Sequence, residues 1–198
     1  MIDVPALRAA AIRLRDAMEA EADALNAADA ALGDGDLGVT MRRGARAVAE
    51  RAGEMPEDDL GRALMVAAQA FTKVSASSYG TLMATGLMAA AKATKGRANI
   101  DPAEVPQLLA AARDAMMARG KAELGGKTVL DSLDAMARAA PTPTAILNAC
   151  EVAQATFRDC PATVGRARIF AEKSVGLDDP GMLAMTAIVR AVTGAQPS

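Results

Sequence analysis

Apolar residues recur at helical spacing along almost the whole chain. In residues 5–28, Leu7, Leu14, Met18 and Leu25 fall at steps of seven, four and seven, which places them on one stripe of a helix. Further predicted helices span residues 40–52, 59–73 and 82–93, and four more begin near residues 101, 128, 142 and 179. No stretch alternates as a strand would, so the pattern predicts an all-α domain of about eight helices.

Short polar side chains mark where the later helices begin. Asp101 and Glu104 form a capping-box pattern around a proline at the first helical position, and Thr128 with Asp131 repeats that pattern without the proline. The pairs Thr142-Pro143 and Asp179-Pro180 mark the last two starts. These signals fix the beginnings of four helices independently of the apolar periodicity.

Composition supports a helical fold and limits the possible chemistry. Aromatic residues make up only 2% of the 198 residues, so strand-forming side chains are scarce, and the length predicts a single domain spanning residues 1–198. The net charge is −2, with one Tyr and no Trp, which argues against nucleic acid as a partner. The chain has no histidine, which excludes a Ser-His triad, a zinc-histidine site and phosphohistidine.

Two further features concern the compartment. Cys150 and Cys160 are too far apart for a CxxC redox motif and are expected to be small apolar core residues. Asp3 and Arg8 interrupt any signal-peptide pattern, and no apolar run approaches the roughly 20 residues of a membrane span. The sequence therefore predicts a cytoplasmic protein with no membrane association.

The main candidate site is an acidic turn between the first two predicted helices, Asp29-Ala-Ala-Leu-Gly-Asp34-Gly-Asp36. Its glycines permit a tight turn on which the three carboxylates converge, and such oxygen ligands suit Mg²⁺ or Ca²⁺. An EF-hand is excluded, because counting from Asp34 the fifth position is Gly38 and the twelfth is Ala45. A solvated Asp/Gly loop that joins two helices is the alternative interpretation.

Two weaker signals point to an anion, and a third motif does not. Residues 74–80 are small and hydroxylic and could hold a phosphate, although the residues alone favour a simple helix cap. Gly126-Lys127-Thr128 is not a Walker A loop, because the first glycine of that motif would fall on Lys121. Arg166 and the open helix start at Asp179 would favour an anion, with a capped helix and surface arginines as the alternative.

Four segments taken together resemble one family, the nucleotide-binding L subunit of dihydroxyacetone kinases. They are residues 29–41, 74–81, 119–131 and the last motif, Gly165 to Gly181. The resemblance implies a barrel of eight antiparallel helices that holds a nucleotide, ATP or ADP, and two Mg²⁺ ions at one end. It also implies a separate K-type subunit that binds a small hydroxyketone or related sugar.

The resemblance also assigns site residues. The metal ligands would be Asp29, Asp34 and Asp36. The nucleotide would contact Leu37, Gly38, Val39, Thr40, Ala76, Ser77, Gly120, Val129, Arg166, Asp179, Pro180 and Gly181. No catalytic side chain is assigned.

The chain departs from the family pattern at several positions. Leu37 and Leu177 replace two histidines, the phosphate loop is about two residues shorter, and Gly126 replaces an aspartate. These changes affect residues expected to bind phosphate and leave the three expected metal ligands unchanged. The favoured hypothesis is phosphoryl transfer from ATP. The alternatives are a fixed ADP coenzyme recharged by a phosphotransferase-system phosphocarrier protein, and a DhaL-like interaction or regulatory module that has lost transfer.

Overall fold

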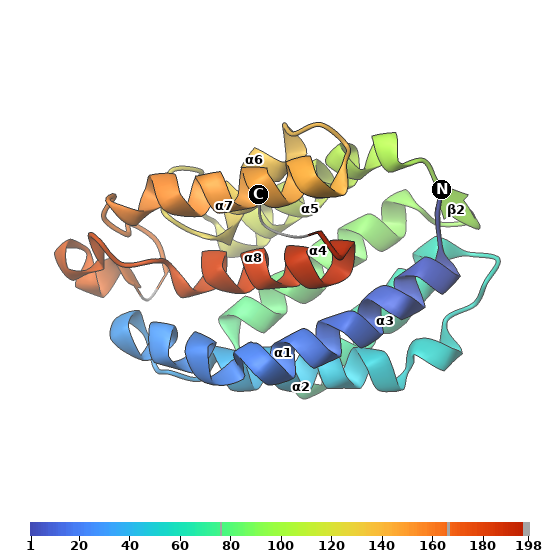
Figure 1. Cartoon of the computed structure of the whole chain (residues 1–198), viewed down its shortest axis with the longest axis horizontal. Helices are drawn as coiled ribbons and strands as arrows, with labels where there is room; N and C mark the ends of the chain where they lie inside the picture. The colour runs from blue at the N-terminus through green and yellow to red at the C-terminus, as the bar shows by residue number, and fades with distance from the viewer. Residues whose placement is uncertain (76, 166, 196–198) are drawn as a thin grey trace.

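The computed structural model describes residues 1–75, 77–165 and 167–195, and within them the chain forms eight α-helices (Figure 1). Their bounds are α1 Val4–Leu32, α2 Leu37–Glu50, α3 Leu60–Val74, α4 Ser78–Ala93, α5 Val105–Gly120, α6 Val129–Ala137, α7 Pro143–Arg158 and α8 Pro180–Thr193. The predicted all-α fold of about eight helices is confirmed.

The helices close into a barrel. Each α-helix packs against the next along the chain, and α8 packs against α1, which completes the ring. Consecutive helices run in opposite directions, so the connections after α1, α3, α5 and α7 lie toward the same end, on the left of Figure 1. These four connections carry the motifs singled out in the sequence.

Two apolar clusters fill the barrel. One is built mainly from α1, α2 and α3, and the other from α5, α6, α7 and α8. Tyr79, Met83 and Val105 pack against both clusters and join them. Several fully buried positions are methionines, whose flexible side chains fill irregular gaps between alanine-rich helices. Among the described helices, none has the length and apolar character needed to cross a membrane.

The structure corrects two details of the sequence prediction. A two-residue strand β1 (Ile2–Asp3) pairs antiparallel with β2 (Asn99–Ile100), although no strand was predicted. So short a pair has no visible alternation, because it is set by the approach of distant segments. Pro102–Glu104 forms a 3₁₀ turn before α5, but the predicted capping box of Asp101 and Glu104 is present. The predicted Thr128 and Asp179 caps are confirmed as well.

The start of α2 lies directly on the backbone of α1. A Cβ added to Gly38 would overlap the carbonyl oxygen of Ala22 and come within 2.8 Å of Asn26 Oδ1. Any side chain at position 38 would therefore push the two helices apart, since the obstruction is rigid helical backbone. Gly44, one and a half turns further along α2, makes a second close approach, to the ring of Phe71.

The first prediction concerns this contact. Gly38→Ala should lower the free energy of unfolding by more than about 3 kcal/mol, because overpacking against backbone cannot be relieved by a rotamer change. Gly53→Ala is the matched control, because a Cβ there meets nothing within 4 Å, and its effect should stay within about 0.5 kcal/mol. Urea unfolding followed by circular dichroism measures both, and equal effects of the two substitutions would contradict the packing argument.

Candidate metal and nucleotide site

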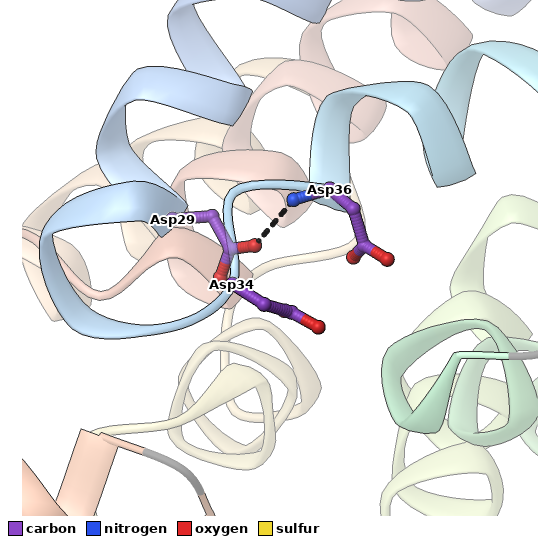
Figure 2. A group of neighbouring side chains, drawn as sticks. All are labelled: Asp29, Asp34 and Asp36. Carbon is purple, nitrogen blue, oxygen red and sulfur yellow. Dashed lines mark hydrogen bonds between the residues drawn. The ribbon is translucent and has the colours of Figure 1, made fainter.

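Three carboxylates meet at the turn between α1 and α2. Asp29, Asp34 and Asp36 each offer an oxygen atom, and these three atoms lie within 4.8 Å of one another. Figure 2 shows the carboxylates of Asp34 and Asp36 on the same side of the turn, pointing away from the helix that carries Asp29. The convergence predicted from the sequence is therefore present.

Side chains of α1 hold this turn in place. Asp29 Oδ2 accepts the backbone N–H of Asp36 at 3.0 Å (Figure 2) and also that of Leu37 at 3.3 Å. One turn earlier, Asn26 Oδ1 accepts the N–H of Val39 at 3.2 Å. Both side chains thus satisfy amides at the start of α2 that have no partner within that helix. Gly35, with φ +76°, supplies the left-handed residue that the turn needs.

The donor set fits a small divalent cation. Mg²⁺ binds oxygen at about 2.1 Å, so opposite ligands in its octahedral shell lie about 4.2 Å apart. Three carboxylate oxygens within 4.8 Å are close to that spacing, and Asp34 and Asp36 are exposed. Mg²⁺ usually keeps water and substrate phosphate in its shell, which an exposed turn permits.

The residues that continue the turn into α2 mostly face inward. The side chain of Leu37 is only 5% exposed and belongs to the apolar core, and Gly38 and Thr40 are buried as well. The amides of Leu37 and Val39 are used by α1, as described above. These residues shape the turn, and Gly38 in particular is explained by the contact between the helices.

The start of α4 contacts the start of α8. Ser77 caps α4, accepting the N–H of Gly80 at 3.0 Å. The hydroxyl of Tyr79 donates to the carbonyl of Gly181 at 3.1 Å, and its ring lies against the same glycine. The predicted phosphate loop and the predicted Asp179-Pro180-Gly181 segment are therefore neighbours. Ala76, also predicted to contact nucleotide, lies outside the described residues.

The loop between α5 and α6 approaches the same region. Gly120 ends α5 and is exposed, and Val129 begins α6 with its side chain buried. Asp131 shapes the loop, because its carboxylate accepts the N–H of Gly125 at 2.6 Å and that of Thr128 at 2.8 Å. These bonds help to hold Lys127 in the left-handed region, at φ +60°.

Lys127 is buried, with 1% of its surface exposed. Its ammonium donates to three backbone carbonyls, those of Arg158 at 2.8 Å, Cys160 at 2.9 Å and Ser174 at 2.6 Å. Burial lowers the pKa of Lys127, and the negative charge of Asp179 acts in the opposite direction. Lys127 therefore does not belong to a Walker A loop but bonds three backbone carbonyls, a structural role that its sequence context does not indicate.

Asp179 is the N-cap residue of α8, and burial changes the pKa of its carboxyl. Its carboxylate accepts the N–H of Met182 at 2.9 Å. Burial raises the pKa of Asp179 to about 6, with the backbone hydrogen bonds and Lys127 lowering it only in part. Pro180 is buried as the first residue of α8. Arg166, predicted to lie near this helix start, falls outside the described residues.

Sequence reasoning thus found the three aspartates and the helix starts, including the capping box of Thr128 and Asp131, but missed three supporting residues. Asn26 could have been found, since it lies one helical turn before Asp29 on the same face. Tyr79 and Lys127 act through contacts with distant segments, for which the sequence carries no periodic signal.

Comparison with known proteins places this geometry in context. The sequence matches the DAK2 domain over residues 31–194. It is 32% identical over 175 residues to the L-erythrulose 1-kinase of Mycolicibacterium smegmatis, covering 83% of this chain and 31% of that protein. It is 28% identical over 180 residues to the PEP-dependent dihydroxyacetone kinase, ADP-binding subunit DhaL, of Escherichia coli, covering 85% of this chain and 86% of that protein.

A solved structure shows the same fold. The dihydroxyacetone kinase from C. freundii in complex with AMP-PNP and Mg²⁺ aligns with a TM-score of 0.75 and 22% identity, over 96% of this chain and 33% of that chain. The chain spans about a third of the length of two curated relatives, the L-erythrulose kinases of M. smegmatis and Pectobacterium atrosepticum. These similarities agree with the resemblance inferred from the four sequence segments.

The second prediction concerns Asp179. A carboxyl whose native pKa is raised from 3.8 to about 6 binds more protons in the folded than in the unfolded state between those values, so stability falls as pH rises through this window. Asp179→Asn keeps a capping side chain but cannot ionise. As the pH rises from 4 to 7, the free energy of unfolding of this variant should increase by about 1–3 kcal/mol relative to that of the wild type. Urea unfolding at several pH values measures the difference, and a difference that does not change with pH would contradict the assignment.

Proposed function

Because the chain belongs to the DAK2 domain family, we propose that it is the nucleotide-binding component of a dihydroxyacetone-type kinase. It would bind ATP or ADP with two Mg²⁺ ions and support phosphoryl transfer to a small hydroxyketone or related sugar. A partner K-type subunit would hold that acceptor. The observation that carries the proposal is the convergence of Asp29, Asp34 and Asp36 at one end of the barrel.

The relatives support both the nucleotide and the acceptor class. The E. coli relative is an ADP-binding subunit and matches this chain over 86% of its own length. The L-erythrulose kinases act on a ketose, and about two thirds of each lies outside the match. This division supports an acceptor site outside the residues of this chain.

The described residues have distinct proposed roles. Asp29, Asp34 and Asp36 would hold the metal ions, and bound Mg²⁺ would neutralise charge on the phosphates. Asp29 also orients the turn through its bonds to the amides of Asp36 and Leu37. The nucleotide would lie against the connections at the same end: Leu37, Gly38, Val39, Thr40, Ser77, Gly120, Val129, Asp179, Pro180 and Gly181. Ala76 and Arg166 are proposed on the sequence alone.

The phosphoryl donor defines two versions of the proposal. In the first, ATP binds, transfers and leaves as ADP. In the second, ADP stays bound as a coenzyme and a phosphocarrier protein recharges it, in line with the PEP-dependent E. coli relative. Nucleotide that survives gel filtration of the purified chain would support the second version, and its loss would support the first.

One observation favours a second candidate, a regulatory or interaction module without transfer. Leu37 stands where the resemblance implies a histidine, and its side chain is buried in the core, so nothing at this position can provide an imidazole. Such a module would keep the barrel and the acidic turn. For either candidate, we predict a cytoplasmic location.

The third prediction tests the metal and nucleotide site. Isothermal titration of the chain with ADP or ATP should show binding that needs Mg²⁺, and Asp34→Asn should abolish it, because a carboxylate ligand is lost. Asp23→Asn is the matched control, an exposed aspartate on α1 away from the turn, and should bind like wild type. No binding at millimolar nucleotide by the wild-type chain would end the proposal.

The fourth prediction separates the two candidates. Mixed with a K-type chain, Mg²⁺ and either ATP or a phosphocarrier system, the protein should phosphorylate dihydroxyacetone or erythrulose, and a mass-spectrometric assay detects the phosphorylated ketose. Asp34→Asn should reduce the rate by at least about a hundredfold, since charge neutralisation dominates such reactions. Nucleotide binding without transfer to any acceptor would support the regulatory module instead.

A further inference from the structure

The connection between α7 and α8, residues 159–179, is here called the α7–α8 segment. In its described parts, 159–165 and 167–179, it contains two short 3₁₀ turns, Ala167–Phe170 and Glu172–Ser174, and no α-helix. Its fixed shape must therefore come from contacts other than a regular helical ladder.

Two sets of bonds close the segment on itself. The N–H of Gly176 donates to the carbonyl of Arg158 at 2.9 Å, and Arg158 Nε donates to the carbonyl of Gly176 at 3.0 Å. Inside the loop, the buried Ser174 hydroxyl accepts the N–H of Ala162 at 2.8 Å and donates to the carbonyl of Ala171. The first pair ties Gly176 to the last residue of α7, and the second joins the two halves of the loop.

Lys127 attaches the segment to a further element, the α5–α6 loop. Its three carbonyl partners belong to the last residue of α7, to Cys160 and to Ser174, so one ammonium joins both ends of the segment. The neighbouring Gly126 also contacts the segment. A Cβ at Gly126 would come within 2.6 Å of the Val164 side chain. The carbonyl of Gly126 accepts the N–H of Thr163 at 3.3 Å.

The other side of the segment packs on the acidic turn. Ala162 and Ala167 are buried against Leu32, the last residue of α1, and Phe170 packs on the same cluster. Leu32 lies between Asp29 and Asp34 in the chain. The segment then leads through Asp178 directly into Asp179, the cap of α8. The α7–α8 segment therefore contacts the end of α1 beside the acidic turn, and it leads directly into Asp179-Pro180-Gly181, where nucleotide contacts are predicted.

We propose that Lys127 is a positioning residue of the nucleotide site: through the carbonyls of Arg158, Cys160 and Ser174 it holds the α7–α8 segment as a wall between the acidic turn and the start of α8. The inference rests on the proposed function for its nucleotide, but the attachment itself involves only residues of this chain.

The chemistry explains why a lysine is needed. The three N–H donors of an ammonium radiate from one nitrogen and can each bond one of three carbonyls grouped around it, whereas the donors of a guanidinium are spread over three nitrogens in one plane. The carbonyl of Arg158 lies at the C-terminus of α7, where the helix dipole favours a positive charge. The left-handed backbone of Lys127 is unfavourable for a residue with a side chain, and such strain persists where surrounding contacts enforce it.

The test combines hydrogen exchange of the nucleotide-free chain with nucleotide titration. Lys127→Met keeps an apolar stem but removes the ammonium that the three carbonyls share. Exchange in residues 159–179 should rise by about tenfold or more while α1 to α3 stay protected, and the nucleotide Kd should rise by about tenfold or more in the presence of Mg²⁺. Lys92→Met, an exposed lysine in α4, is the control and should change neither quantity.

A second variant keeps the test decisive if Lys127→Met does not fold. Ser174→Ala removes the hydroxyl that closes the same segment and should give the same pattern at smaller amplitude. Faster exchange in the segment with an unchanged nucleotide Kd would overturn the inference, as would a rise in exchange spread evenly over the barrel. If the wild-type chain binds no nucleotide, the proposed function fails together with the role of the wall. Normal wild-type binding with unchanged exchange in Lys127→Met overturns this inference alone.

Discussion

The close contact between α1 and α2 sets the geometry on which the site depends. Because Gly38 has no side chain, the first turn of α2 lies on the carbonyl of Ala22, and the four residues between the helices must reverse the chain in a small space. Asp29 and Asn26 can then reach the amides at the start of α2. The same reversal brings Asp34 and Asp36 beside Asp29. A packing constraint inside the barrel thus produces an acidic cluster at its end.

The rest of the site is assembled by contacts between connections far apart in the sequence. Tyr79 joins the starts of α4 and α8, Lys127 joins the α5–α6 loop to the α7–α8 segment, and Leu32 joins that segment to the acidic turn. An alternating helical barrel puts these connections at one end, where a ligand can contact all of them. All three links use backbone carbonyls or apolar surfaces, and none uses the carboxylates of the acidic turn.

The sequence predicted the parts of this structure that are encoded locally. Caps such as Asp101, Thr128 and Asp179 mark helix starts because the side chain bonds an amide only two or three residues away. Apolar periodicity gave the helices, since each buries one face. The strand pair at residues 2–3 and 99–100 and the carbonyl partners of Lys127 depend on tertiary approach, for which no local pattern exists. The family resemblance supplied the closed barrel, which periodicity alone does not define.

The central claim is that the cluster of Asp29, Asp34 and Asp36 gathers divalent cations that in turn hold a polyphosphate. The most direct measurement is the anomalous difference map of a crystal grown with Mn²⁺ in place of Mg²⁺ and a non-hydrolysable ATP analogue. The account predicts metal peaks bonded to these three carboxylates at about 2.1 Å, with phosphate oxygens completing the shell. Carboxylates that point to solvent with no metal peak between them, beside a nucleotide bound elsewhere or absent, would contradict it.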